Sequence, residues 1–407
     1  VLFRRESNRL RRGKPGTPMA AKFSSTEMSS LMMATPFTGI SGGQLLVAGG
    51  CNFSDKPAAE GGTKEYYSDI YALDITTRSP AGWRRIGKLP LPLAYGASVT
   101  TPEGLVWIGG NNNEEVSGQV FFVNWNGEKQ QLHIFELPPL PIPLDNLSAT
   151  YADGHLYVAG GKGKSQTAPI GKDDSQAAPT NPLFSLQLTP SLQKEWVRLP
   201  DFPGPVRVQP VLTAQQSGDG IRLYLAGGFQ PVSPHQEAIV CTDMLSYHPE
   251  TKQWRNEVFL PSFADGSHRT ITGGCAIASG DSSIFLIGGV NYNRFRDALN
   301  HPEPDYLRHP TDWYKFNTSL LQYFHKTLDH LGDYEELARA GAGIANNANM
   351  TIIIGGELKP GIRTPEVNAF ELIIPPPENT RSLKITIKND LFLISFYNFV
   401  SLSVESK

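Results

Sequence analysis

One short pattern recurs along the chain and constrains its fold more than any other feature. An apolar run closed by two glycines occurs at six places: LLVAGG ending at Gly50, LVWIGG at Gly110, LYVAGG at Gly161, LYLAGG at Gly228, IFLIGG at Gly289 and IIIGG at Gly356. The intervals between these glycines are 60, 51, 67, 61 and 67 residues. Self-similarity at a period of this length is the sequence signature of a repeat architecture.

Each apolar run predicts a strand that is covered on both faces. The runs are apolar at every position instead of alternating, as in sheets that stack against neighbouring sheets. Two glycines at the end of such a strand allow positive φ and close backbone approach where the chain turns near a crowded centre.

The rest of each unit also repeats and supplies three more strands. A small-residue segment such as YGASVT (95–100) precedes each run, and a further strand such as SDIYALD (68–74) follows the glycines. A fourth segment often carries an aromatic residue and then a proline break, as at Trp83, Phe135, Trp196 and Trp254. Four strands in six units predict an all-β, six-bladed β-propeller of the kelch type with antiparallel blades. A solenoid would need shorter repeats.

The ends of the chain set the predicted domain limits. Residues 1–36 are basic and irregular, 37–388 form the propeller, and 389–407 form a tail. The sixth unit lacks a fourth strand, and we expect the β-branched segment at 383–387 to supply it. No apolar segment follows the basic start, so no signal peptide is visible, and the run at 391–400 is too short to cross a bilayer. We therefore expect no membrane span.

Composition and common motifs exclude several function classes. A net charge of −3 gives no indication of a nucleic-acid partner. Gly163-Lys164-Ser165 lacks the earlier glycine of a phosphate-binding loop, and the glycines at 341–343 lack the third glycine of a dinucleotide fingerprint. Four histidines cluster late in the chain, namely His301, His309, His325 and His330. Their spacings of 8, 16 and 5 residues match no familiar metal-ligand pattern. We expect neither a metal nor another cofactor.

Two segments of the last two units are richer in functional side chains. The insert at 290–316 carries more aromatic residues than a solvated loop needs, and it either covers the propeller or lines a ligand pocket. The loop after the sixth glycine pair runs from Glu357 through Lys359 to Arg363 around a Pro-Gly turn. A carboxylate and a guanidinium there could serve as proton shuttle and anion clamp, whereas an exposed charged turn is the plainer interpretation.

At this loop the sequence resembles the N-acetylneuraminate epimerases, the sialic acid mutarotases, which are six-bladed kelch propellers. The resemblance rests on GELKPGIRT (356–364) and VNAFEL (367–372), with further similarity at GGVNYNRF (288–295), AYGAS (94–98) and GPVRVQ (204–209). It covers most of residues 37–372. The order of these segments differs from the usual one and is similar to that of a cyclically permuted branch of the family. A closed ring tolerates such a change of chain ends.

The resemblance implies an enzyme that equilibrates the α and β anomers of a small acidic sugar, and it implies a periplasmic or secreted location. It implies Glu357 as the acid/base and Arg363 as the clamp for the sugar carboxylate. It adds candidates for substrate binding, namely Tyr95, Arg207, Asn291, Asn293 and Lys359. The alternative is a non-catalytic kelch module that binds a protein or a carbohydrate. A kelch-type oxidase would need copper ligands of Tyr and His type, and no such arrangement stands out. The sequence leaves the oligomeric state open.

Overall fold

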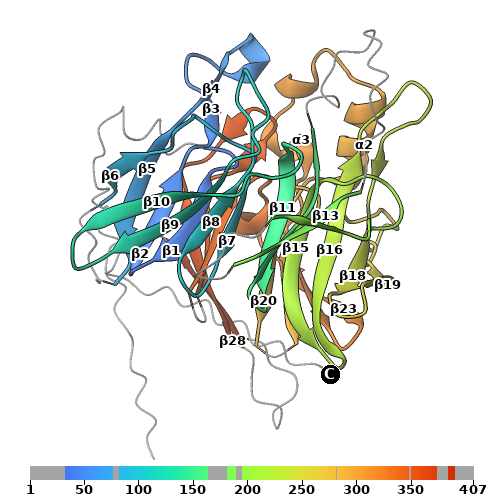
Figure 1. The fold of residues 1–407 in the computed structure, drawn as a ribbon. Helices are drawn as coiled ribbons and strands as arrows, with labels where there is room; N and C mark the ends of the chain where they lie inside the picture. The colour runs from blue at the N-terminus through green and yellow to red at the C-terminus, as the bar shows by residue number, and fades with distance from the viewer. Residues whose placement is uncertain are drawn as a thin grey trace, which may run out of the picture.

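The six predicted units fold into six four-stranded antiparallel sheets that stand around a common axis in the computed structural model (Figure 1). The structure describes residues 33–76, 82–163, 181–188, 195–280, 282–347, 350–373 and 384–389. The calls on residues 1–32, on Lys164 and Ser165, and on 390–407 lie outside these ranges. Within the described part, no helix is both long and apolar enough to cross a bilayer.

Each blade runs from an innermost to an outermost strand in chain order. Blade 1 consists of β1 (Phe37–Ser41), β2 (Gln44–Ala48), β5 (Asp69–Asp74) and β6 (Arg84–Lys88). Blade 2 consists of β7 (Ala97–Thr100), β8 (Leu105–Ile108), β9 (Val120–Asn126) and β10 (Gln131–Leu137). Blade 3 consists of β11 (Asp145–Ala152), β12 (His155–Lys162), β13 (Leu183–Gln187) and β14 (Val197–Leu199).

The other three blades repeat this order. Blade 4 consists of β15 (Val208–Ser217), β16 (Gly220–Gln230), β18 (Asp243–His248) and β19 (Gln253–Phe259), and the short β17 (Ile239–Val240) also pairs with β16. Blade 5 consists of β20 (Cys275–Ser279), β21 (Ser283–Ile287), β22 (Ser319–Phe324) and β23 (Thr327–Asp333). Blade 6 consists of β24 (Gly343–Asn347), β25 (Met350–Ile354), β28 (Val367–Ile373) and β29 (Lys384–Asn389).

The strand that completes the sixth blade comes from the carboxyl-terminal side of the chain. β29 pairs antiparallel with β28, with Phe370 opposite Ile387. This confirms the expectation that the segment at 383–387 supplies the outer strand. The ring itself is joined by residues before β1, because the Gly356 N–H donates to the Met33 carbonyl at 2.9 Å. Residues Met33 to Pro36 therefore belong to the closure of the ring, although the sequence assigned them to the irregular segment.

The core lies between the blades. Six clusters of buried apolar residues each combine side chains from two neighbouring sheets. One of them joins Leu45 and Val47 of blade 1 to Ile352 and Ile354 of blade 6. The second strands β2, β8 and β21 are buried at every position. This is why the apolar runs show no alternation.

The glycine pairs are the points where neighbouring blades touch. The N–H of the second glycine donates to a carbonyl just before the next blade's inner strand, as from Gly50 to Leu93 (2.8 Å), Gly110 to Leu144 (2.9 Å) and Gly289 to Arg339 (2.8 Å). The first glycine of each pair has no space for a side chain. A Cβ on Gly49, for example, would lie 2.3 Å from the Leu93 carbonyl oxygen.

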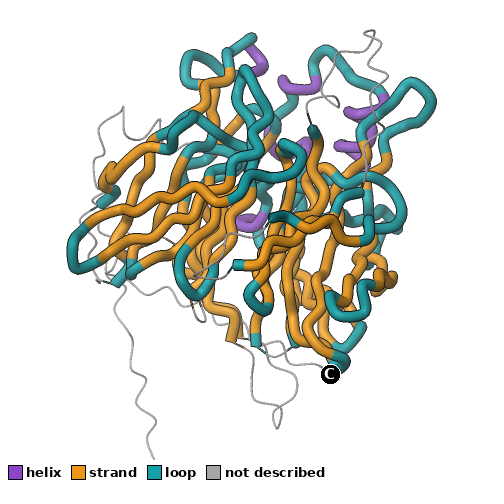
Figure 2. The backbone as a smooth tube through the Cα atoms, in the orientation of Figure 1, coloured by secondary structure: helices purple, strands orange, loops and turns teal. Residues whose placement is uncertain are grey.

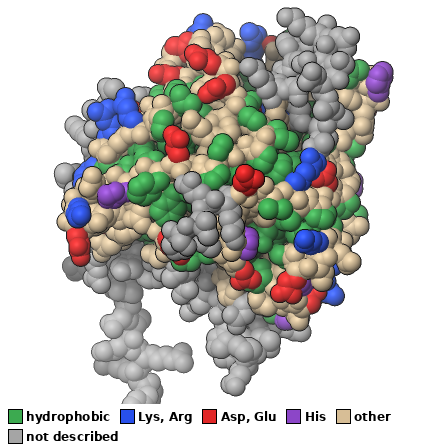
Figure 3. Space-filling view, viewed as in Figure 1, with side chains coloured by type: hydrophobic (Ala, Val, Ile, Leu, Met, Phe, Trp, Pro, Cys, Tyr) green, Lys and Arg blue, Asp and Glu red, His purple; other side chains and the backbone are tan. Residues whose placement is uncertain are grey.

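Loops at one end of the ring carry most of the helical segments (Figure 2). They include the insert of blade 5, which forms α2 (Tyr292–Asn300), η3 (Tyr306–Arg308) and α3 (Thr311–Tyr314). On the face drawn in Figure 3, the basic and acidic side chains of the described residues are interspersed.

We predict that alanine lowers the unfolding free energy more at a glycine that touches the next blade than at a glycine that only has a positive φ. Gly49→Ala and Gly154→Ala both place alanine at positive φ, +63° and +76°, but nothing lies within 4 Å of a Cβ on Gly154. Gly154→Ala should cost about 1 kcal/mol of unfolding free energy, and Gly49→Ala about 1–3 kcal/mol more, because of the clash with Leu93. Denaturant unfolding of both variants tests this. Equal losses would show that the contact does not limit stability.

Candidate functional site

Two hairpins from neighbouring blades rise at the helical end of the ring. β3 (Cys51–Phe53) pairs with β4 (Lys64–Tyr66) after the first glycine pair, and Figure 1 shows this hairpin above blade 1. β26 (Glu357–Lys359) pairs with β27 (Ile362–Arg363) after the sixth pair. Because blades 6 and 1 adjoin, the two hairpins stand side by side where the ring closes.

Glu357 and Arg363 form an ion pair across the second hairpin. They are direct partners in the β26–β27 register, and opposite residues of an antiparallel pair point to the same face. Arg363 Nη2 lies 2.8 Å from Glu357 Oε1. The Arg363 side chain is 1% exposed and that of Glu357 is 23% exposed, so the carboxylate is the accessible end of the pair.

The Arg363 guanidinium is only partly satisfied. Its plane lies over the Phe53 ring, with Cζ 4.6 Å from the ring centroid. No residue in the described part of the chain accepts a hydrogen bond from Nε or Nη1, although both atoms are buried. A buried donor without a partner costs about 1–3 kcal/mol, and more when it is charged. The Nε–H and the Nη1 hydrogens point in different directions on the planar group, so the two nitrogens offer separate donors to ligand oxygens.

The surroundings shift the pKa of the Glu357 carboxyl upward. Burial raises it, because removal from water disfavours the charged form, and the positive charges of Arg363 and Lys64 oppose part of this shift. A carboxyl with a raised pKa holds and releases a proton more readily near neutral pH than an exposed one does.

A tyrosine and a lysine stand beside this carboxyl. Lys64 Nζ donates to Tyr95 Oη at 3.0 Å and lies 5.0 Å from the centroid of the Tyr95 ring. The Cys51 thiol donates to the same hydroxyl at 3.5 Å. Burial raises the pKa of Tyr95 well above its usual value, and the charges of Cys51 and Glu357 add to this. The phenol is thus held in its protonated form next to the ion pair.

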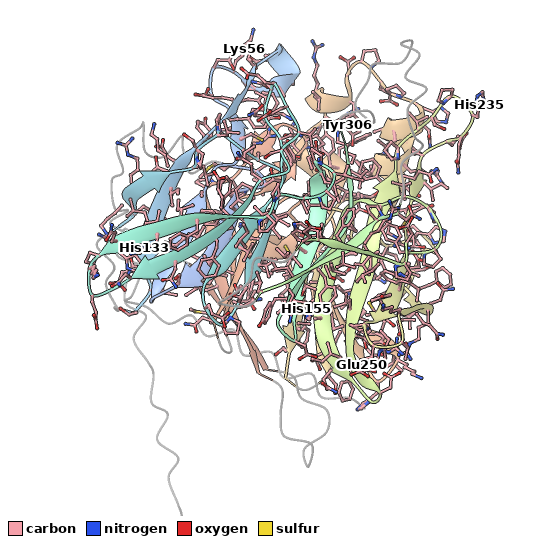
Figure 4. The ribbon with its side chains drawn as sticks, viewed as in Figure 1. Lys56, His133, His155, His235, Glu250 and Tyr306 are labelled. Carbon is pink, nitrogen blue, oxygen red and sulfur yellow. The ribbon has the colours of Figure 1, made fainter. Side chains whose placement is uncertain are left out.

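The aromatic insert of blade 5 packs against the same hairpin. Lys359 Nζ donates to the carbonyls of Leu307 at 3.2 Å and His309 at 2.5 Å, and it lies 5.5 Å from the centroid of the Tyr314 ring. Tyr306, labelled in Figure 4 at the helical end of the ring, has a pKa raised to about 12 by burial and by the charges of Tyr314 and Glu357. The insert therefore contacts the turn at 359–361, and a segment that covers the site has to make such a contact.

A groove of about 510 Å³ lies where these segments meet. Its walls come from the 3₁₀ turn η1 (Ala58–Glu60) at the tip of the first hairpin, from Leu307 and Arg308 of the insert, and from the turn at 359–362. The lining includes the turn between Glu357 and Arg363 but neither of these two residues.

The structure does not bring every predicted residue to this place. Arg207 is fully buried, with Nη1 donating to the Gly227 carbonyl and Nη2 bound to both oxygens of Asp243 at 2.8 and 2.9 Å. Arg339 occupies the equivalent position in blade 6 and donates to the Gly355 carbonyl. Arg207 thus has a structural role, because it binds the carbonyl of a glycine pair as Arg339 does. The sequence alone could not distinguish such an arginine from one that binds substrate.

The other predicted residues have mixed positions. Asn291 caps α2, because its Oδ1 accepts from the Arg294 N–H at 3.0 Å. Asn293 is exposed on the same helix. Lys359 is bound to carbonyls of the insert, as described above, whereas Tyr95, Glu357 and Arg363 lie together.

Sequence reasoning missed the contribution of the first hairpin. Lys64, Phe53 and Cys51 all contact the Tyr95, Glu357 and Arg363 group. A signal was present, because Cys51 and Glu357 both follow directly after a glycine pair and occupy equivalent positions in adjacent blades. Within the described residues, no group of three or more His, Cys, Asp or Glu side chains is arranged to hold a metal ion.

Comparison with known proteins agrees with this architecture. A structure titled "Structure of YjhT" superposes with a TM-score of 0.57 at 16% sequence identity, covering 88% of this chain and 97% of that one. A likeness at this identity establishes the fold, a six-bladed β-propeller.

Several curated relatives carry the same name. Proteins named N-acetylneuraminate epimerase match from Pasteurella multocida at 25% identity, Shigella sonnei at 28% and Haemophilus influenzae at 29%. The matches cover 46%, 58% and 54% of this chain and 50%, 60% and 58% of those proteins. The chain thus matches between half and three-fifths of the length of these relatives. The matches do not give the order of segments in them, so the cyclic permutation stays a prediction.

The model of the family described as N-acetylneuraminate epimerase matches residues 21–134 and 138–374. This span is well over half of the sequence and includes both hairpins of the site and all of the blades except β29 and the end of β10. The chain belongs to the N-acetylneuraminate epimerase family.

Proposed function

We propose that this protein is a mutarotase that interconverts the α and β anomers of N-acetylneuraminate. The observation that carries the proposal is the buried Arg363 guanidinium, which holds Glu357 with one nitrogen and leaves two others without a partner. That arrangement suits a ligand that offers a carboxylate next to the atom where a proton is exchanged. Family membership and the names of the relatives support the choice of sugar.

In the proposed mechanism, Arg363 Nη1 donates to the sugar carboxylate and fixes the anomeric carbon beside Glu357. The Glu357 carboxylate takes the proton of the anomeric hydroxyl. The bond between the anomeric carbon and the ring oxygen breaks, and the ring oxygen takes up a proton. Tyr95, whose hydroxyl accepts from Lys64, is the neighbouring group suited to donate it. Rotation and closure on the other face reverse these proton transfers, so protons balance and no oxidation state changes.

We predict that Glu357→Gln removes the base and leaves binding in place. The amide keeps the shape and the hydrogen bond to Arg363 but cannot take a proton, so kcat should fall by roughly 10²–10⁴ with little change in KM. The measurement is ¹H NMR of the α anomer freshly released by a sialidase. Glu128→Gln, at an exposed position in the turn between β9 and β10, is the matched control and should behave as wild type.

Two outcomes of this measurement would contradict the proposal. A folded Glu357→Gln protein that equilibrates the anomers at the wild-type rate would remove Glu357 from the mechanism. A wild-type protein that leaves the spontaneous rate unchanged would favour the non-catalytic binding module.

We predict that Arg363→Lys mainly weakens the binding of acidic sugars. Lysine keeps the charge but loses the fixed planar donors of the guanidinium, so KM should rise by about tenfold or more while kcat changes less. Binding of neutral sugars should change little. Arg85→Lys, exposed on β6 of blade 1, serves as the control. A uniform loss for acidic and neutral sugars would argue against a carboxylate clamp.

The pH dependence of activity should respond to Lys64. Glu357 acts as a base only when ionised, so kcat/KM should rise with pH through a pKa above that of an ordinary carboxyl. Lys64→Met removes a charge that lowers this pKa, so the acid limb of the profile should move to higher pH. Lys64→Arg should restore it, and Lys56→Met, at the exposed hairpin tip in Figure 4, should leave it in place. A limb that moves to lower pH in Lys64→Met would contradict the assignment.

A further inference from the structure

Six equivalent backbone positions form a ring around the axis, directly below the hairpins of the site. Each lies at or just before the start of an inner strand and takes a positive φ. They are Thr35 (52°), Tyr95 (62°), Asn146 (52°), Gln209 (55°), Gly273 (71°) and Gly341 (61°). Backbone hydrogen bonds link them from blade to blade, from Asn146 N to Tyr95 O at 2.7 Å and onward through Gly273 N to Gln209 O, Gly341 N to Gly273 O and Thr35 N to Gly341 O.

Glycine would serve this ring best, because it takes positive φ without strain. Blades 5 and 6 use it, whereas blades 1 to 4 carry side chains. Long or β-branched residues in this conformation are backbone outliers, which cluster at functional sites. Tyr95 already belongs to the site described above. The presence of Gln209, a long side chain at 55°, therefore calls for an explanation beyond the turn itself.

Gln209 is the free end of a chain of polar side chains. Asp145, which is fully buried, accepts from Asn111 Nδ2 and from Asn146 Nδ2, both at 2.6 Å. Asn146 Oδ1 in turn accepts from Gln209 Nε2 at 3.0 Å. The carboxylate offers only acceptors, so it fixes the orientation of both amides in the chain. Gln209 Oε1 is left as the terminal acceptor, and within the described residues no side chain or backbone group is recorded as donating to it.

Gln209 Oε1 lies toward blades 5 and 6, where the ring positions are the glycines Gly273 and Gly341. A Cβ built on Gly273 would lie 3.5 Å from Gln209 Oε1 and 3.5 Å from the Ala340 Cβ. Ala340 exchanges two backbone hydrogen bonds with Glu357, at 2.8 and 3.1 Å. Gln209 Oε1 and the Glu357 hairpin thus lie on either side of the two glycine positions.

We propose that Gln209 determines specificity by accepting a hydrogen bond from an N–H or O–H group of the sugar, remote from its anomeric centre. The inference rests on the proposed function and extends it, with the sugar lying over Gly273 and Gly341 between Arg363 and Gln209. A terminal acceptor polarised by a carboxylate attracts donors and disfavours anions. The donor is either the acylamino N–H of the ring or a hydroxyl of the side chain of the sugar.

The test replaces Gln209 with the residue that blades 5 and 6 already have. Gln209→Gly keeps the backbone carbonyl that binds Gly273 and relieves the positive φ, so the protein should fold. Gln209→Asn, a residue that tolerates positive φ, withdraws the amide by one methylene and should give the same loss. Lys252→Gly is the matched control, because it relieves a φ of 56° at an exposed turn far along blade 4.

Affinity is measured by titration calorimetry, independently of anomer exchange, with three sugars. They are N-acetylneuraminate, an analogue with hydrogen in place of its acylamino group, and an analogue without its hydroxylated side chain. Gln209→Gly should bind N-acetylneuraminate roughly 3- to 10-fold more weakly than wild type. The difference should vanish for the analogue that lacks the relevant donor, which also identifies that donor.

The outcomes separate this inference from the proposed function. Equal affinity of wild type and Gln209→Gly for N-acetylneuraminate, or the same ratio for all three sugars, would overturn the role of Gln209. If wild type binds the sugar without accelerating anomer exchange, the mutarotase proposal fails while the affinity ratios still decide on Gln209. If wild type binds none of the three sugars, both proposals fall.

Discussion

The contact between a glycine pair and the neighbouring blade is the interaction on which the rest of this structure depends. The first glycine leaves no space for a side chain because the neighbour's backbone lies against it, and the second donates its N–H to a carbonyl of that neighbour. Each contact sets the distance between two sheets, and the apolar side chains of both sheets fill the space between them. Such contacts recur around the ring and set the position of the loops that leave the second strands.

The site follows from the contact that closes the ring. Gly356 binds the Met33 carbonyl, and Glu357 comes next in the chain, just as Cys51 follows Gly50 in the adjoining blade. The hairpins that begin at these two positions therefore stand side by side. The Glu357–Arg363 pair comes from one of them, and the other contributes the Phe53 ring and Lys64. The contact that closes the ring therefore also brings the residues of the candidate site together.

The sequence allowed the fold to be predicted closely, because a strand buried on both faces and a glycine pair leave an unambiguous local pattern. It also indicated that Glu357 and Arg363 face one another, since a short Pro-Gly turn places them in register. Contacts between blades left no such pattern. The sequence does not distinguish Arg207 from Arg363, yet both Nη atoms of Arg207 are bound to Asp243 and a carbonyl, whereas Arg363 keeps Nη1 as well as Nε without a partner. Lys64 was missed because its partner Tyr95 is 31 residues away in another blade.

The arginine of the proposed site couples binding to chemistry. In the proposed mechanism, a single guanidinium holds Glu357 through Nη2 and donates to the sugar carboxylate through Nη1, so both carboxylates draw on one positive charge. In the free protein, this charge offsets part of the burial effect on the pKa of Glu357. A sugar carboxylate bound to the same group weakens that compensation and displaces water, and both effects raise the pKa of Glu357 further. In the proposed mechanism, the pKa of Glu357 therefore rises most with an acidic ligand, whereas a neutral sugar displaces water but adds no negative charge.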